Sequence, residues 1–247
     1  MAYKRSVIIQ ARAMRRSGFK ILRYILGKVL RLWIKETIGS ENIPSKGPAI
    51  FVSNHLSYFD FLLCAAVLSK NYIVFLAQRK IKHISVVRWF TKFDNVVYVD
   101  RNYPGYTFFK ELMRHLDADR FLVIYPEGSR SRTGKMGMPK LGFVKLAMKA
   151  NVPIIPVAMN GTFEILPPSS RIPRLKRCKV FIGKRMYISP DNPEFHDIFF
   201  RHGLNKKLGN LTDEELQKIA VHIMDKIRIL AEEEWDNNAA AKIRKII

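Results

Sequence analysis

Short apolar segments of the kind that form β-strands alternate with helical patterns through the middle of the chain, and this alternation is the strongest constraint on the fold. Strand-like segments occupy residues 49–53, 71–77, 95–100, 120–126, 153–159 and 179–189, and helical patterns occupy residues 58–68, 85–92, 104–118, 140–150 and 213–235. Strands that alternate with helices in this way are typical of layered α/β folds. The sequence therefore predicts an α/β fold in which a mixed β-sheet is flanked by helices.

The length of 247 residues is enough for one large domain with a sizeable core. Thr212 and Glu215 have the spacing of a capping box at the start of the last predicted helix. No internal repeat or long low-complexity segment divides the chain. We expect a main α/β domain over residues 39–247 and an N-terminal segment of different character over residues 1–38.

The N-terminal segment is basic and amphipathic. Residues 1–35 contain ten Lys or Arg residues and no acidic residue. From Phe19 onward, apolar pairs recur with a period of about 3.6 residues, which is the period of an α-helix. We predict two amphipathic helices, over residues 6–16 and 19–35, joined by a Ser-Gly turn.

A helix that packs its apolar side against a core would show the same periodicity. The absence of carboxylates, together with Tyr24 and Trp33 as residues suited to a lipid headgroup boundary, favours helices that lie in a membrane surface. No apolar run reaches the roughly 18–20 residues that cross a bilayer, and charges interrupt every candidate signal peptide. We therefore expect a two-helix membrane-binding motif that holds the protein on the cytoplasmic face of the cell membrane, as a peripheral or monotopic protein.

The formal net charge of +22 and the pI near 10.2 predict an anionic partner. Charge alone leaves nucleic acid, anionic lipid and an acidic protein open. The aromatic residues lie among aliphatic residues in predicted strands and helices, and no nucleic-acid-binding motif occurs. We therefore expect an anionic membrane surface and no nucleic acid, and a basic nucleic-acid-binding protein is the distant alternative.

The segment "NHLSYFD" places His55 and Asp60 in the turn between a predicted strand and a predicted helix. Open α/β folds bind ligands at this edge of the sheet. Asp60 is placed to accept a hydrogen bond from His55 Nδ1, which would leave Nε2 free to act as a base. A structural role is the alternative, because Ser57 and Asp60 also match a capping box and His55 would then only fill the turn.

A second polar segment, "YPEGSRSR", directly follows another predicted strand. An arginine side chain matches the oxygens of a phosphate in a bidentate manner, and the backbone N–H groups of a loop of small residues add further donors. A solvated polar hairpin is the alternative. The candidate residues of this segment, with one arginine that ends a neighbouring predicted strand, are Glu127, Gly128, Ser129, Arg130 and Arg101.

Four segments together resemble the sequence blocks of the glycerolipid acyltransferases. "NHLSYFD" resembles the NHx4D or HX4D motif, "NVVYVDR" the second block, "YPEGSRS" the FPEGTRS block and "VPIIPVAM" the fourth block, in the order of the family. The resemblance covers about residues 47–190, and the chain is similar in size to the bacterial, PlsC-type 1-acyl-sn-glycerol-3-phosphate acyltransferases. Two positions depart from the family: Asn95 replaces a glycine, and Gln78 lies in a segment where the family often carries Ala-Lys-x-Glu-Leu.

The resemblance implies a 1-acylglycerol-3-phosphate O-acyltransferase of phospholipid biosynthesis. Such an enzyme transfers a fatty acyl group from acyl-ACP or acyl-CoA to the sn-2 hydroxyl of lysophosphatidic acid and produces phosphatidic acid. Acylation of glycerol 3-phosphate, or of another lysolipid or an amine, is the alternative within the superfamily. No cofactor beyond the acyl donor is expected, and no cluster of residues implies a metal.

The resemblance also assigns roles to the candidate residues. His55 would be the general base and Asp60 its orienting partner, and the absence of a GxSxG segment agrees with direct transfer without a serine acyl-enzyme. Glu127 would hydrogen-bond a glycerol hydroxyl or hold an arginine in place. The residues implied to bind substrate are Arg101, Glu127, Gly128, Ser129 and Arg130.

Overall fold

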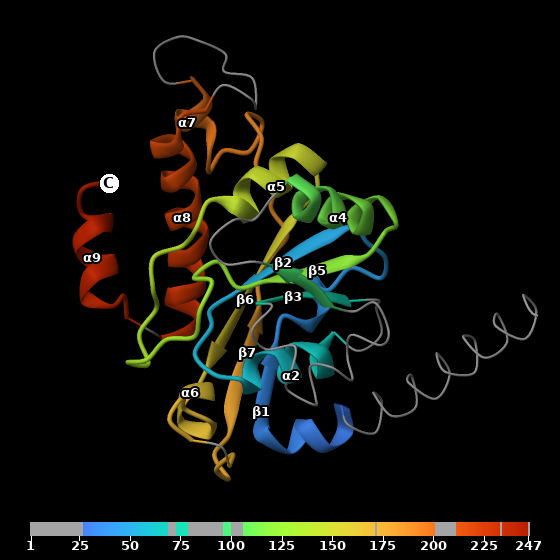
Figure 1. The fold of residues 1–247 in the computed structure, drawn as a ribbon, viewed down its shortest axis with the longest axis vertical. Helices are drawn as coiled ribbons and strands as arrows, with labels where there is room; N and C mark the ends of the chain where they lie inside the picture. Colours follow the sequence, from blue (N-terminus) through green and yellow to red (C-terminus); the bar gives the residue numbers. More distant parts are fainter. Residues whose placement is uncertain are drawn as a thin grey trace, which may run out of the picture.

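The computed structural model describes residues 27–68, 73–78, 96–99, 106–170, 172–200, 211–232 and 234–246. Within them the chain forms a seven-stranded sheet in the order β1-β7-β6-β2-β5-β3-β4, with helices on both faces (Figure 1). The strands are β1 (Ile34–Ile38), β2 (Ala49–Ser53), β3 (Ile73–Gln78), β4 (Val96–Val99), β5 (Phe121–Ile124), β6 (Ile154–Asn160) and β7 (Cys178–Ile182).

The sheet is mixed, as the sequence predicts. β6 and β7 pair antiparallel, and all other neighbouring strands pair in parallel. β2 lies in the middle of the sheet, and all five of its residues are buried. Its apolar run explains this position, because a strand covered by helices on both faces has no side that favours polar residues.

Alternate residues of β2 point to the two cores of the domain. Ile50 and Val52 join the core beneath α4 (Tyr106–Asp117), α5 (Gly142–Ala150) and α8 (Asp213–Ala231). Phe51 joins the opposite core with Leu63 of α2 (Phe59–Val67). The shorter elements are η1 (Arg31–Trp33), η2 (Ser40–Asn42), α6 (Thr162–Ile165), α7 (His196–Phe200) and α9 (Asn237–Ile243).

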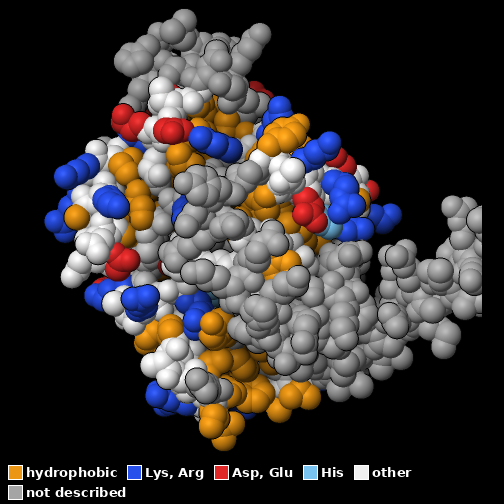
Figure 2. All heavy atoms as spheres, in the orientation of Figure 1, with side chains coloured by type: hydrophobic (Ala, Val, Ile, Leu, Met, Phe, Trp, Pro, Cys, Tyr) orange, Lys and Arg blue, Asp and Glu red, His pale blue; other side chains and the backbone are white. Residues whose placement is uncertain are grey.

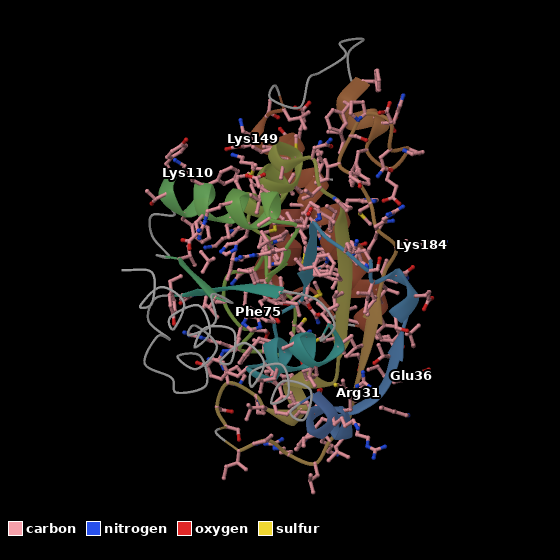
Figure 3. All side chains as sticks on the ribbon, turned by 90° about the vertical axis from the view of Figure 1, so that its right-hand side faces the viewer. Arg31, Glu36, Phe75, Lys110, Lys149 and Lys184 are labelled. Carbon is pink, nitrogen blue, oxygen red and sulfur yellow. The ribbon has the colours of Figure 1, made fainter. Side chains whose placement is uncertain are left out.

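The outer helices carry their charges away from the sheet. Figure 3 shows Lys110 and Lys149 on the outer surfaces of α4 and α5, while Phe75 of β3 lies within the sheet layer. No helix in the described part of the chain has the length and apolar character needed to cross a membrane.

The predicted helix over residues 19–35 is wrong at its C-terminal end. Residues 27–30 are helical, but Arg31–Trp33 form a 3-10 turn and Ile34–Ile38 form β1, which pairs in parallel with β7. The edge of β7 that does not pair with β6 supplies backbone hydrogen bonds to residues 34–38. The helical period of the apolar residues in the sequence gives no sign of this pairing. The predicted helices over 6–16 and 85–92, and the start of the 19–35 helix, lie outside the described residues, and the division at residue 38 stays a prediction.

The capping box at the start of α8 is present. The Glu215 N–H donates to Thr212 Oγ1 at 3.2 Å, and the Thr212 N–H donates to Glu215 Oε2 at 2.8 Å. The helix ends at Ala231, four residues before the predicted end, because Glu232 adopts a left-handed conformation with φ of 55°.

We predict that Thr212→Ala lowers the free energy of unfolding by about 1 kcal/mol, because the variant loses the side-chain acceptor for the Glu215 N–H. Thr212→Ser keeps that acceptor and should stay close to the wild type. Urea denaturation of the three proteins measures the difference. Equal losses in both variants would show that the hydroxyl is not what stabilises this helix end.

Candidate functional site

The candidate residues meet at one edge of the sheet. β2, β5, β6 and β3 run in parallel, so their carboxyl ends lie at the same edge. His55 follows β2, and the segment from Glu127 to Arg130 follows β5. This is the edge at which open α/β sheets bind their ligands.

His55 and Asp60 form a hydrogen-bonded pair. His55 Nδ1 lies 2.8 Å from Asp60 Oδ2, and the His55 side chain is 18% exposed whereas that of Asp60 is fully buried. The same oxygen accepts hydrogen bonds from the backbone N–H groups of Leu56 and Ser57, each at 2.8 Å. Asp60 therefore holds the turn and orients the ring at once. The capping box that the sequence offered as the alternative is only half formed, because the Asp60 N–H donates to the Ser57 C=O and no side chain caps α2.

The ring of His55 also stacks on the ring of Tyr125. Its centroid lies 4.2 Å from that of Tyr125, with an interplanar angle of 23°. Burial raises the pKa of Tyr125 well above its usual value, so its phenol stays neutral. With Nδ1 directed to Asp60, Nε2 is the ring nitrogen available to a substrate.

Glu127 connects two loops through its carboxyl group. Oε1 accepts a hydrogen bond from the His55 N–H at 2.8 Å, and Oε2 accepts one from the Gly137 N–H at 2.8 Å. Burial raises the pKa of Glu127 to about 8, although these two hydrogen bonds act in the opposite direction. Glu127 does not line the cavity beside His55, and no arginine of the described residues forms a salt bridge with it. The geometry gives it a positioning role toward His55.

Arg130 lies over the ring of Tyr58, with its guanidinium carbon 3.2 Å from the ring centroid. Burial lowers the pKa of Arg130, but a guanidinium remains charged at any physiological pH. Its Nη1 is buried and has no hydrogen-bond partner among the described residues. An orphaned donor on a cation is costly unless an anion binds it, so this side chain is suited to a phosphate.

A cavity of about 500 Å³ opens beside these groups. Its volume is within the range of about 300–1,000 Å³ that is common for ligand pockets. The polar part of its lining includes His55, Ser129, Arg130 and Lys140, and much of the apolar part comes from β3, α4 and α5. The apolar residues include Leu76, Phe108, Phe109, Leu112, Phe143 and Leu146. The same cavity is therefore lined by an imidazole, by two cationic side chains and by an apolar surface that can accommodate a hydrocarbon chain.

Comparison with known proteins places the chain in a family. A family model described as Acyltransferase matches residues 36–160, about half of the chain. The chain belongs to this acyltransferase family. The matched region of the acyltransferase chain includes β2, the turn with His55 and Asp60, the segment after β5 and all of β6.

Curated relatives match over part of their length. A chloroplastic 1-acyl-sn-glycerol-3-phosphate acyltransferase of Brassica napus is 33% identical over 135 residues, which are 53% of this chain and 39% of the relative. A 1-acyl-sn-glycerol-3-phosphate acyltransferase of Borreliella burgdorferi is 29% identical over 126 residues, 50% of each chain. The acyltransferase chain therefore spans half or less of these relatives.

A solved structure shares the fold. The crystal structure of PlsC from Thermotoga maritima, a 1-acyl-sn-glycerophosphate (LPA) acyltransferase, is similar with a TM-score of 0.62 and 21% sequence identity. The similarity covers 93% of this chain and 88% of that chain. The α/β fold with its mixed sheet is common to both proteins.

Two polar side chains of the turn with His55 hold it in place through hydrogen bonds that were not predicted from the sequence. Asn54 exchanges hydrogen bonds with the backbone of Met159 in β6, donating to its C=O and accepting from its N–H, both at 2.9 Å. Ser57 Oγ donates to the Leu166 C=O at 2.7 Å. The order of the blocks in the sequence indicated that these segments belong together, but the partners are more than 100 residues apart.

Lys140 is a cation that lines the cavity and that was not predicted from the sequence. Its backbone N–H donates to the Pro126 C=O at 3.0 Å, and its side chain lies across Gly128, where an added Cβ would be 3.0 Å from Lys140 Cε. Gly128 has a φ of 73° and is held by Gln78, whose Nε2 donates to the Gly128 C=O at 2.7 Å. Gly128 thus supplies both the left-handed backbone and the space for the lysine.

The remaining candidate residues are placed only in part. Ser129 is exposed and lines the cavity. Arg101 lies outside the described residues. The substrate-binding role of both residues stays a prediction.

The raised pKa of Glu127 predicts a pH-dependent stability. Between pH 4.5, its usual pKa, and about 8, the folded chain keeps a proton on Glu127 that the unfolded chain loses. The contribution of Glu127 to the free energy of unfolding therefore falls as pH rises through this window. Glu127→Gln stays neutral, so the stability of the variant minus that of the wild type should rise by roughly 1.4 kcal/mol per pH unit.

Urea denaturation of both proteins at several pH values inside the window measures this difference. Since all other titrating groups are shared, their effects cancel in the comparison. A difference that stays constant across the window would mean that the two backbone hydrogen bonds keep Glu127 ionised.

Proposed function

We propose that this acyltransferase-family protein transfers a fatty acyl group from an acyl thioester to the sn-2 hydroxyl of lysophosphatidic acid, which produces phosphatidic acid. The observation that carries the proposal is the shared cavity of His55, paired with Asp60, and the cations Arg130 and Lys140. The names of the curated relatives support the same reaction. Acyl-ACP or acyl-CoA is the proposed donor.

The substrate is proposed to bind in two parts. Its phosphate contacts Arg130 and Lys140, which are cations on the same side of the lining as His55. Neither side chain forms a salt bridge with a described carboxylate, so both charges are available to an anion. The apolar surface from α4 and α5 receives an acyl chain.

The reaction then needs one base. Nε2 of His55 removes the proton of the sn-2 hydroxyl while the hydroxyl oxygen attacks the carbonyl carbon of the thioester. Asp60 stabilises the imidazolium that forms on His55. The tetrahedral intermediate collapses with cleavage of the carbon–sulfur bond. The proton on His55 passes to the released thiolate, so the base is regenerated and no acyl-enzyme forms.

The place of the reaction is proposed to be the cytoplasmic face of the cell membrane. The lysolipid and its product both reside in a bilayer, and the basic N-terminal segment over residues 1–38 is the proposed anchor. Anionic lipid would attract its ten basic residues within 1–35.

A direct assay tests the proposed reaction. The purified full chain is incubated with acyl-ACP or acyl-CoA and, in separate reactions, with lysophosphatidic acid, glycerol 3-phosphate and lysophosphatidylcholine. Preferential formation of phosphatidic acid supports the proposal. Preferential acylation of either other acceptor would overturn the substrate assignment and leave the acyl-transfer chemistry standing.

We predict that His55→Ala lowers kcat by about 10²- to 10⁴-fold, because the general base is lost. The fold should be retained, since the ring lies in a turn and is partly exposed. Circular dichroism and the steady-state assay separate the two effects. Near-normal turnover by a folded His55→Ala protein would rule out the mechanism.

Asp60→Asn is the companion variant that tests orientation. Asparagine keeps an acceptor for the Leu56 and Ser57 N–H groups but carries no charge to stabilise the imidazolium. We expect a stability change within about 1–2 kcal/mol and a fall in kcat of about 10²-fold or more. Unchanged kinetics would leave Asp60 with a capping role alone.

We predict that Lys140→Met raises the KM for lysophosphatidic acid by roughly tenfold, equal to about 1.4 kcal/mol of lost phosphate binding. The KM for the acyl donor should change little. Lys149→Met, which removes an exposed lysine from the outer surface of α5, is the matched control (Figure 3). A change in the donor KM alone would assign Lys140 to the donor.

A further inference from the structure

We propose that residues 166–170 and 172–177, here named the Ile172 loop, form a second membrane-contacting surface that inserts into an anionic lipid bilayer together with η1. The inference rests on the proposed function, because a lipid substrate requires the protein to work at a bilayer. The loop itself belongs neither to the His55 site nor to the proposed N-terminal anchor over residues 1–38, whereas η1 lies within that anchor.

The Ile172 loop and the neighbouring segment expose large apolar side chains. Leu175 is 93% exposed and Ile172 is 77% exposed. Leu32 of η1 is 65% exposed, and Val29 is 46% exposed. Figure 2 shows hydrophobic side chains gathered at this lower end of the molecule, with Lys and Arg side chains beside them. Apolar side chains that gather in this way on a surface mark an interaction site.

Hydrogen bonds hold these apolar residues in one place. The Arg174 N–H donates to the Ile165 C=O at 2.8 Å, which closes the base of the loop. Trp33 Nε1 donates to the Arg174 C=O at 3.0 Å and thus joins η1 to the loop. At the tip, Ser170 Oγ donates to the Ile172 C=O at 3.0 Å. Because these hydrogen bonds hold the described residues of the loop in place, their contact with a membrane costs little additional conformational entropy.

The charges around the apolar tip are positive. Residues 161–185 contain seven Lys or Arg residues and one acidic residue, Glu164. The exposed cations Arg31, Arg174, Lys176 and Arg177 form no salt bridge with any carboxylate in the described part of the chain. Apolar side chains flanked by unpaired cations are the pattern that binds anionic bilayers, where the chains enter the interface and the cations meet the headgroups.

The combination favours a bilayer over an acidic protein as the occupant. An acidic carrier protein would satisfy the cations, but it would leave Ile172 and Leu175 without an apolar environment unless it carried a matching apolar groove. A bilayer satisfies both at once. The Trp33–Arg174 hydrogen bond joins the segment with the exposed Val29 and Leu32 to the loop, and we propose that one bilayer surface contacts both.

The loop is also connected to the candidate site. It follows β6 and α6, at the same edge of the sheet as His55. Ser57 Oγ donates to the Leu166 C=O at 2.7 Å, so the loop begins at a residue bonded to the turn that carries His55. Insertion of the loop would therefore turn this edge of the sheet toward the lipid that supplies the acceptor.

The first experiment measures insertion without any acyl transfer. Leu175→Cys in the full chain is labelled with an environment-sensitive NBD maleimide, which spares the buried Cys64 and Cys178. Addition of phosphatidylcholine vesicles that contain phosphatidylglycerol should shift the NBD emission to the blue. The control is Ile229→Cys, at an exposed position of α8 away from the loop. Its NBD emission should show no shift.

The second experiment measures affinity. The double variant Ile172→Ser with Leu175→Ser should bind the same vesicles roughly tenfold more weakly than the wild type, because two partly inserted apolar side chains are lost. Ile229→Ser should bind as the wild type does. Activity of the double variant on a short-chain lysophosphatidate dissolved as monomers should be unchanged.

Three results would overturn the inference. They are an NBD emission that stays unshifted with anionic vesicles, a shift that appears only when acyl carrier protein is added, and vesicle affinity unchanged by the double variant. Because these readouts need no turnover, an inactive wild-type protein that still shows the shift would refute the proposed function and leave the loop assignment standing.

Discussion

The buried carboxylate of Asp60 is the interaction on which the candidate site depends. One oxygen accepts three hydrogen bonds at 2.8 Å, from His55 Nδ1 and from the backbone N–H groups of Leu56 and Ser57. A buried charge without such donors would cost several kcal/mol. The conformation of the turn and the orientation of the imidazole are therefore set by the same oxygen, and a change in either would remove donors from it. Oδ1, the other oxygen of Asp60, is buried without a hydrogen-bond partner among the described residues.

The surroundings of this carboxylate are kept largely free of other negative charge. Burial raises the pKa of Glu127 to about 8 and that of Cys64 to about 12, and it also raises that of Tyr125. Positive charge lies instead on the cavity side, on Arg130 and Lys140. This separation suits a substrate with an anionic head and a neutral hydroxyl, since the head binds to the cations while the hydroxyl approaches a base supported by Asp60.

The edge of the sheet at the carboxyl ends of its parallel strands carries both the candidate site and the proposed membrane contact. The parallel order of β5, β2 and β6 brings the segment with Arg130, the turn with His55 and the start of the Ile172 loop to one end of the domain. Hydrogen bonds from Asn54 and Ser57 to the β6–α6 region make these segments one unit. A lipid substrate that enters from a bilayer would thus meet the base and the cations without crossing the domain.

The sequence by itself determined whatever depends on near neighbours. Apolar runs predicted the central strands, because both faces of β2 are buried. Thr212 and Glu215 predicted the start of α8. The spacing of His55 and Asp60 predicted their hydrogen bond, because about one turn separates them.

Only the tertiary structure decided the rest. Residues 34–38 form a strand because the edge of β7 pairs with them, and Glu127 binds the backbone of His55, which lies 72 residues earlier in the chain. Lys140 reaches the cavity because its backbone bonds to Pro126 and its side chain fills the space above Gly128. Such contacts follow from the order of strands in the sheet, and local spacing carries no information about that order.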